Sequence, residues 1–206
     1  MAITSKKPPR KETVGAQYLC FDVMTEEGDW TSEFEADVEK TKVVKSVKVT
    51  ENSESSDVYA SGETYDSDTE TSTIDVEVEV VAFPEDTLAK MRGDVVDEGG
   101  LILSGGKGVR PYFAYGKVVR MKGGKERYDW YPKCKLAENS DDTSTSEGSP
   151  SEQTDTIKIT AYPFSGNGDI VAKVTYDSMP EGLTEDKWFA KPILTKADLT
   201  TAVGGK

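Results

Sequence analysis

The segment from residue 73 to residue 83, TIDVEVEVVAF, alternates apolar and polar residues more strictly than the rest of this chain. Successive side chains of a β-strand point to opposite faces, so this pattern predicts a strand with one buried and one wet face. The buried face carries Val76, Val78 and Val80. The wet face carries three acids, Asp75, Glu77 and Glu79.

Other apolar and aromatic runs bounded by turn residues predict more strands. They lie at 17–24, 43–50, 111–121, 125–136, 156–164 and 169–177. The glycines of Lys122-Gly123-Gly124 allow the positive φ of a tight turn, which predicts a hairpin of 111–121 and 125–136. The segment Ser165-Gly166-Asn167-Gly168 predicts a second hairpin, of the last two strands. One face of 125–136 is expected to carry Tyr128, Trp130, Cys134 and Leu136.

The sequence PEDTLAKMRG, residues 84–93, predicts a short helix directly after the strand at 73–83. Pro84 is tolerated in a first helical turn, Glu85 and Asp86 suit the positive end of the helix dipole, and Gly93 marks the stop. Near the end of the chain, a brief helical turn is expected through Trp188, followed by a weakly structured tail.

Four polar segments are predicted to lack regular structure. Residues 1–13 are expected to form a flexible arm and 191–206 an extension, on either side of a β domain at 14–190. Within that domain, 51–71 is interpreted as a long polar coil between two strands, and the acidic segment 138–155 as an exposed loop.

Composition argues against several classes of protein. Among 206 residues there is no histidine, and no pair of carboxylates stands out, so no active site is expected and the chain is interpreted as a non-enzyme without cofactors. No apolar run is long enough for a membrane span. Cys20 and Cys134 lack metal-site spacing and are expected to be buried free thiols. One acidic segment matches the ligand spacing of a calcium loop, at Asp66, Asp68, Glu70 and Glu77. It lacks the glycine and the flanking helices that such a loop needs, so no metal is expected.

Charge is distributed unevenly along the chain, whose net charge is −13. Residues 51–98 hold 15 acids and 2 bases, whereas residues 101–135 hold 2 acids and 9 bases. An acidic whole argues against binding nucleic acid through its phosphates. The two blocks either cancel as solvated faces of one subunit or meet between subunits, and the sequence leaves both open.

The order of these elements resembles the major tail proteins of long, non-contractile-tailed bacteriophages. The resemblance covers about residues 14–190. It rests on Val14-Gly15 before the first strand, the polar excursion before IDVEVEVVAFPEDTLAKMRG, the continuation DVVDEGGLIL, the run PYFAYGKVVRMKGGKERYDWYPKCKL and the closing Trp188-Phe189.

The resemblance implies a mainly β fold, with two packed antiparallel sheets forming a tail-tube sandwich or barrel, a short flanking α-helix, a long inter-strand loop and extended terminal arms. It also implies hexameric rings that stack into a tail tube, through which the genome passes without specific DNA binding. The expected partners are further copies of the chain, a tape-measure protein, and tail terminator and baseplate or distal tail proteins. The expected location is the virion tail, assembled in the cytoplasm of the host bacterium.

Within such a tube, the wet face of 73–83 is expected to line the lumen through Asp75, Glu77 and Glu79, where repeated acids would repel DNA phosphate. The alternative is that this face is the outside of the tube, because alternation cannot distinguish two wet surfaces. Contacts between rings are expected from the apolar residues of 51–71 and from the 111–136 hairpin turn, namely Val58, Tyr59, Tyr65, Lys122 and Lys125. A β-sandwich adhesin or decoration module of a virion or cell surface is the alternative function.

Overall fold

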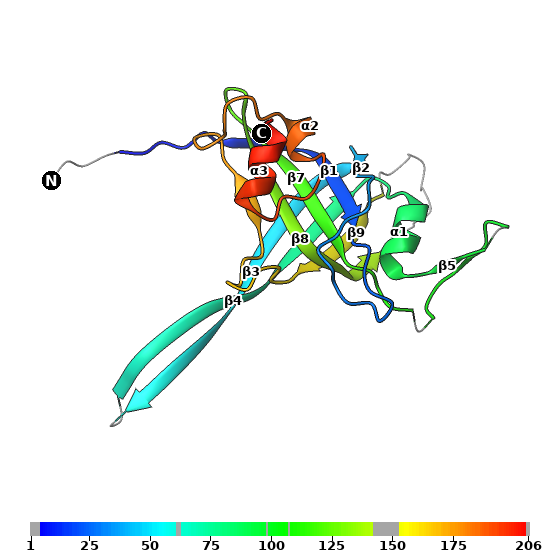
Figure 1. The fold of residues 1–206 in the computed structure, drawn as a ribbon, viewed down its shortest axis with the longest axis horizontal. Coiled ribbons are helices and arrows are strands. Elements are labelled where there is room, and N and C mark those ends of the chain that lie inside the picture. Colours follow the sequence, from blue (N-terminus) through cyan, green and yellow to red (C-terminus); the bar gives the residue numbers. More distant parts are fainter. Residues whose placement is uncertain (1–4, 61–62, 98, 107, 142–152, 205–206) are drawn as a thin grey trace, which may run out of the picture.

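The computed structural model describes residues 5–60, 63–97, 99–106, 108–141 and 153–204, with the backbone alone at 54–60 and 63–70. These residues form an eight-stranded antiparallel sheet, a separate two-stranded ribbon and three short helices (Figure 1). The elements are β1 (Lys11–Phe21), β2 (Glu39–Thr41), β3 (Val44–Ala60), β4 (Glu63–Val80), α1 (Glu85–Arg92), β5 (Val95–Val96), β6 (Ile102–Leu103), β7 (Phe113–Met121), β8 (Lys125–Ser140), β9 (Asp155–Ala161), β10 (Ala172–Val174), α2 (Glu185–Trp188) and α3 (Lys196–Val203).

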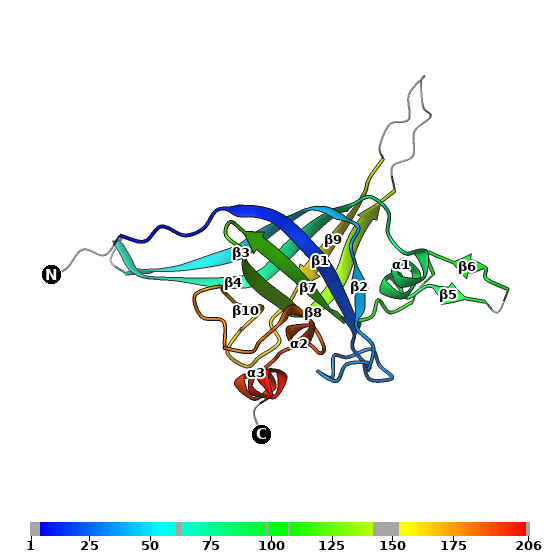
Figure 2. The same ribbon diagram turned by 90° about the horizontal axis from the view of Figure 1, so that it is seen from above.

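The large sheet has the strand order β2, β1, β7, β8, β9, β4, β3, and β10 also pairs with β8. It curls, so that Leu19 on β1 and Val76 on β4 belong to one buried cluster although three strands separate them (Figure 2). The described strands form no ladder between β3 and either β1 or β2, so this sheet is not a closed barrel. The predicted mainly β fold with antiparallel sheets and a short helix is confirmed.

Alternation along β1 supplies two hydrophobic cores on opposite faces of the sheet. Leu19 and Phe21 point into the inner core, which the curled sheet and α1 enclose. Tyr18 and Cys20 point into the outer core, which lies under the C-terminal segment. Burial of one large apolar side chain in such a core contributes about 1.5–3 kcal/mol. The outer core is centred on Trp130, Trp188 and Phe189.

The face predicted for the strand at 125–136 is wrong in its second half. Tyr115 on β7 lies opposite Tyr131, but Phe113 lies opposite Cys134, so β8 has one extra residue between these pairs. Pro132 lies in this bulge, where a residue that cannot donate a backbone hydrogen bond is tolerated. The extra residue reverses the alternation. Tyr128 and Trp130 therefore face the outer core, whereas Cys134 and Leu136 face the inner core.

The second predicted hairpin, of 156–164 and 169–177, is also wrong. Its turn is present, because the Phe164 amide donates to the Asp169 carbonyl at 2.9 Å. Beyond the turn the two strands separate, and each pairs with a different part of β8. Ile159 of β9 lies opposite Leu136, and Ala172 of β10 lies opposite Trp130.

The segment 51–71 is the largest correction, because its described residues continue two strands and are not coil. Pairs run from Glu51 opposite Ile74 to Ala60 opposite Glu63, so β3 and β4 form one long hairpin. Figure 1 shows this hairpin extending well away from the body of the protein. Its outer part is polar along both strands, so it has none of the apolar alternation that signals a strand with one buried face.

The predicted helix after the strand at 73–83 is confirmed as α1, which buries Leu88 and Met91 against the inner core. Pro84 precedes it, and Gly93 ends it in the left-handed conformation at φ 73°. The helical turn expected at Trp188 is confirmed as α2. The free thiols Cys20 and Cys134 are buried, as predicted.

The ends of the chain contain more regular structure than expected. Strand β1 begins at Lys11, inside the predicted arm, and pairs with Met121. Residues 196–203 of the predicted extension form α3, in which Thr195 and Asp198 make a capping box. The predicted loop at 138–155 begins as the end of β8, through Ser140, and residues 142–152 lie outside the described part of the chain.

Candidate assembly surfaces

The wet face of β4 is exposed, as its alternation predicts. Val76, Val78 and Val80 are buried, while Asp75 and Glu77 are exposed and Glu79 is half-buried. The structure places these three acids in one row, flanked by β3 on one side and β9 on the other. Whether this row faces a lumen stays a prediction.

The acidic row is surrounded by bases and hydrogen-bond donors. Glu77 lies opposite Lys48 on β3 and opposite Lys158 on β9. The Asp75 carboxylate accepts hydrogen bonds from Asn52 at 2.8 Å and from Thr160 at 3.0 Å. This face is therefore a mixed polar surface, on which the acids are held in fixed positions and partly compensated.

The outer part of the β3–β4 hairpin is a two-stranded ribbon. Strand β4 pairs with β9 only from Ile74 to Val80, so in the described structure the ribbon beyond residues 52 and 73 has no further strand beside it. At about 3.3 Å per residue, the nine residues 52–60 span roughly 30 Å. A ribbon of this kind presents backbone donors and acceptors along both edges, which favours pairing with another chain.

The candidate contact residues Val58, Tyr59 and Tyr65 lie near the tip of this ribbon. Val58 is opposite Asp66 and Tyr59 is opposite Thr64, which leaves Tyr65 as the extra residue of a bulge. Their side chains lie outside the described part of the structure. Their role in contacts between rings stays a prediction.

Lys122 and Lys125 lie elsewhere, at the β7–β8 turn on the body of the protein. Both are exposed, and Gly123 and Gly124 between them have φ of 84° and 69°, as the predicted tight turn requires. The Lys125 ammonium lies 4.6 Å from the centre of the Tyr176 ring. The structure therefore does not bring these lysines together with the tip of the β3–β4 hairpin.

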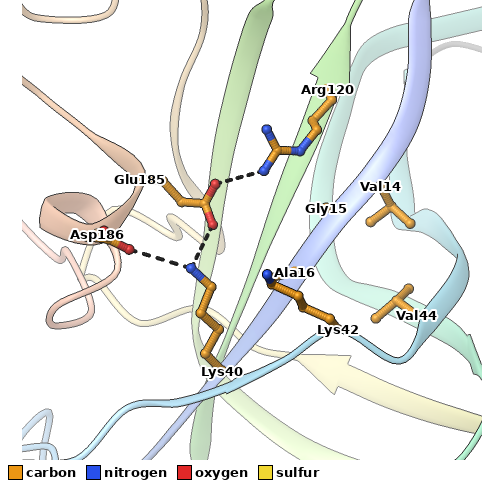
Figure 3. Close-up of a pocket in the computed structure, with 9 residues that line it drawn as sticks. All are labelled: Val14, Gly15, Ala16, Lys40, Lys42, Val44, Arg120, Glu185 and Asp186. Atoms are coloured by element: carbon orange, nitrogen blue, oxygen red, sulfur yellow. Dashed lines mark hydrogen bonds and ion pairs between the residues drawn. The ribbon is translucent and has the colours of Figure 1, made fainter.

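A charged cluster fastens α2 to the sheet and lines a cavity of about 510 Å³ (Figure 3). The Glu185 carboxylate contacts Lys40 of β2 at 3.0 Å and Arg120 of β7 at 3.1 Å, and it accepts a hydrogen bond from the Tyr18 hydroxyl. Partial burial raises the pKa of Glu185, but the hydrogen bonds from Tyr18 and Lys40 and the two positive charges outweigh this, so the net pKa is lowered. Burial, followed by the bond to Glu185, raises the pKa of Tyr18 to about 12.

A buried ion pair lies on the inner face of the sheet. The Lys117 ammonium is 3.7 Å from the Asp129 carboxylate, which also contacts Arg127 at 2.9 Å. Lys117 and Asp129 are directly opposite each other on β7 and β8. Desolvation lowers the pKa of Lys117 to about 8, although the Asp129 charge acts in the opposite direction.

Neither cluster was among the sequence-based candidates. The Lys117–Asp129 pair could have been found by counting outward from the 122–124 turn of the predicted hairpin. The Glu185 cluster could not, because it joins segments that are far apart in the sequence and depends on how the C-terminal segment crosses the sheet.

The described residues contain no group of three or more histidine, cysteine, aspartate or glutamate side chains placed to hold a metal ion. Among the helices described, none has the length and apolar character needed to cross a membrane.

Comparison with known proteins gave little information about family. No family model matches the sequence, and no curated protein matches it. Among solved structures, the chain is similar to a chain of the cryo-EM structure of the anti-feeding prophage baseplate, 6-fold symmetrised. The two are 10% identical, the TM-score is 0.42, and the match covers 85% of this chain and 99% of that chain. Similarity at this level does not assign a family.

Proposed function

We propose that this chain is a structural protein of a phage-like virion tail and, more specifically, a subunit that assembles as stacked hexameric rings into a tail tube. The projecting β3–β4 hairpin carries this proposal. A polar two-stranded ribbon of this length buries too little apolar surface to be stable by itself. Its exposed edges suit it for pairing with neighbouring copies.

The open edge of the sheet supports assembly into a ring. The sheet is curled but open, and among the described strands β3 pairs only with β4, although β1 lies close to it. Joining sheets edge to edge around a ring would cover such edges, which isolated proteins otherwise have to protect. The projecting hairpin would then reach along the tube axis to the next ring.

The polar face of β3, β4 and β9 is the proposed lining of the bore. Asp75, Glu77 and Glu79 would repel DNA phosphate, while Lys48 and Lys158 keep the net charge of the face moderate. A lining of this kind lets DNA pass without holding it. Inside the tube the chain would contact a tape-measure protein, and at the tube ends terminator and baseplate proteins, as the resemblance implies.

Two variants test the role of the hairpin. The first replaces residues 54–68 with a short Gly/Ser linker, and the second changes Val58, Tyr59 and Tyr65 to serine while keeping the ribbon length. If backbone edges make the contact, sedimentation velocity should show tube-sized assemblies for the wild type and the serine variant, and nothing larger than single rings for the deletion. If apolar side chains make the contact, neither variant should form assemblies larger than single rings.

The control is thermal unfolding monitored by near-ultraviolet circular dichroism, which should show an intact core in both variants. A folded deletion variant that assembles as the wild type does would contradict the proposed role of the hairpin. A wild type that is monomeric at every concentration would contradict the tube function and favour an adhesin or decoration module.

A further inference from the structure

The β5–β6 ribbon carries half of the large apolar side chains that the described part of the chain leaves exposed. Val95 and Leu103 lie directly opposite each other on this ribbon and are 65% and 58% exposed. Their neighbours Val96 and Ile102 form the next pair and are also exposed. A two-stranded ribbon with apolar side chains in water needs a covering surface.

A groove of suitable chemistry lies between α2 and α3. Its volume is about 410 Å³, and Lys187 and Lys191 stand at its border as exposed bases. Asp198 also lines it, and its carboxylate accepts hydrogen bonds from the backbone amides of Leu194 and Thr195. The β5–β6 ribbon carries the opposite charge, because Asp97 directly follows β5 and is exposed. Apolar surface and charge are therefore complementary between ribbon and groove. The apolar lining of the groove is formed by Ala190, Pro192, Ile193 and Ala202.

The ribbon and the groove belong to opposite faces of the sheet. The ribbon follows α1, whose Leu88 and Met91 are buried in the inner core. The groove follows Trp188, which is buried in the outer core. Figure 2 shows β5 and β6 projecting to one side of the molecule, away from α3. Within one subunit the sheet separates the ribbon from the groove. The ribbon can therefore enter only the groove of another molecule.

We propose that the β5–β6 ribbon of one subunit docks in the α2–α3 groove of a second copy of this chain. Val95 and Leu103 cover the apolar lining of the groove, and Asp97 lies beside Lys187 and Lys191. Because two different surfaces meet, the contact is heterologous and generates a ring or a filament. The proposal deepens the tube function above by naming one of its contacts between subunits, and it rests on that function.

Cysteine cross-linking tests this contact in the full-length chain. Leu103→Cys and Ala190→Cys are prepared as separate proteins, mixed, and treated with a short bismaleimide. The native Cys20 and Cys134 are buried, so the reagent is directed to the introduced thiols. We expect dimers in the mixture and their loss when either variant is treated alone. Adding Lys191→Glu to the Ala190→Cys protein should reduce the dimer yield.

The matched control is Val81→Cys, which places a thiol at a site that is 50% exposed but lies outside the ribbon. Mixed with Ala190→Cys it should give no dimers. Dimers from Leu103→Cys alone would show that two ribbons contact each other, which would overturn the proposal. Absence of dimers in the mixture of Leu103→Cys and Ala190→Cys would also overturn it. Electron microscopy of the same samples separates the two claims. Tubes without mixed dimers contradict only the ribbon contact, whereas mixed dimers without rings or tubes support that contact and contradict the tube function.

Discussion

Lys117 and Asp129 face each other across β7 and β8 with 3.7 Å between ammonium and carboxylate, and the whole residues are only 4% and 2% exposed. Removing two charges from water is costly, and their attraction offsets that cost only in part. The Arg127 guanidinium contacts the Asp129 carboxylate at 2.9 Å, and the Lys117 ammonium lies 5.5 Å from the centre of the Tyr131 ring. Burial of this pair therefore predicts how the free energy of unfolding depends on pH.

Replacing Lys117 with methionine should change how stability depends on pH. In the wild type the folded-state pKa of Lys117 is about 8, below its ordinary value of 10.5. Between these values the unfolded state binds more protons, so this lysine makes the free energy of unfolding rise with pH. Urea unfolding of both proteins between these two pH values should show that the free energy of unfolding rises more with pH for the wild type than for Lys117→Met. A difference that is independent of pH would contradict the lowered pKa.

Replacing Glu185 with glutamine should change the pH dependence of stability in a different range, the acid range. The folded-state pKa of Glu185 is lowered from 4.5, so its contribution to stability is present above that value and is lost as the pH falls through the folded-state pKa. The wild type should be more stable than Glu185→Gln at neutral pH, and the two should converge in acid. Equal stability at neutral pH would mean that the cluster in Figure 3 does not fasten α2.

Gly116→Ala should destabilise the fold because β7 passes close under the outer core. A Cβ atom at this position would lie 2.7 Å from Phe189 and 2.9 Å from Trp130. Forcing atoms into a packed core costs about 1–3 kcal/mol. The control is Gly166→Ala, where nothing lies within 4 Å of the added atom. Equal melting temperatures for the two variants would mean that the C-terminal segment is not packed on β7.

Reversing the charges of Lys122 and Lys125 together to glutamate should impair assembly and leave the fold intact. Both side chains are exposed, and surface charges contribute little to stability. If the basic block meets acids of a neighbouring subunit, sedimentation should show smaller assemblies for the reversed variant. Its neutral counterpart, with glutamine at both positions, should lie between it and the wild type. Assembly of the reversed variant at the wild-type rate would mean that the acidic and basic blocks compensate each other within single subunits.

Strands that carry apolar alternation could be predicted from the sequence, because one buried face leaves a period of two. The strand at 73–83 and the hairpin around Gly123 and Gly124 are of this kind. The sequence of the outer β3–β4 ribbon is polar along both strands, so it resembles coil although the two strands pair with each other as far as Ala60 and Glu63. Hydrophobic periodicity reports burial and gives no signal for a strand whose sequence is polar at every position.

Pairing between distant strands could not be predicted either. A single extra residue near Pro132 reverses which side chains of β8 face which core, and this depends on a bulge that alternation does not show. The separation of β9 and β10 after their common turn depends on β8 being long enough to pair with both. For the candidate site, the sequence identified the exposed acids of β4 but not the Glu185 cluster, whose members come from four separate segments.

Electron microscopy of the purified full-length chain in negative stain tests the central claim most directly. The tube function predicts rings with a central hole at low concentration and hollow tubes at high concentration, with sixfold symmetry in end views. The variant lacking residues 54–68 provides the comparison, because it should show the body of the subunit without axial stacking. Dispersed single subunits for the wild type at every concentration and salt level would contradict the account.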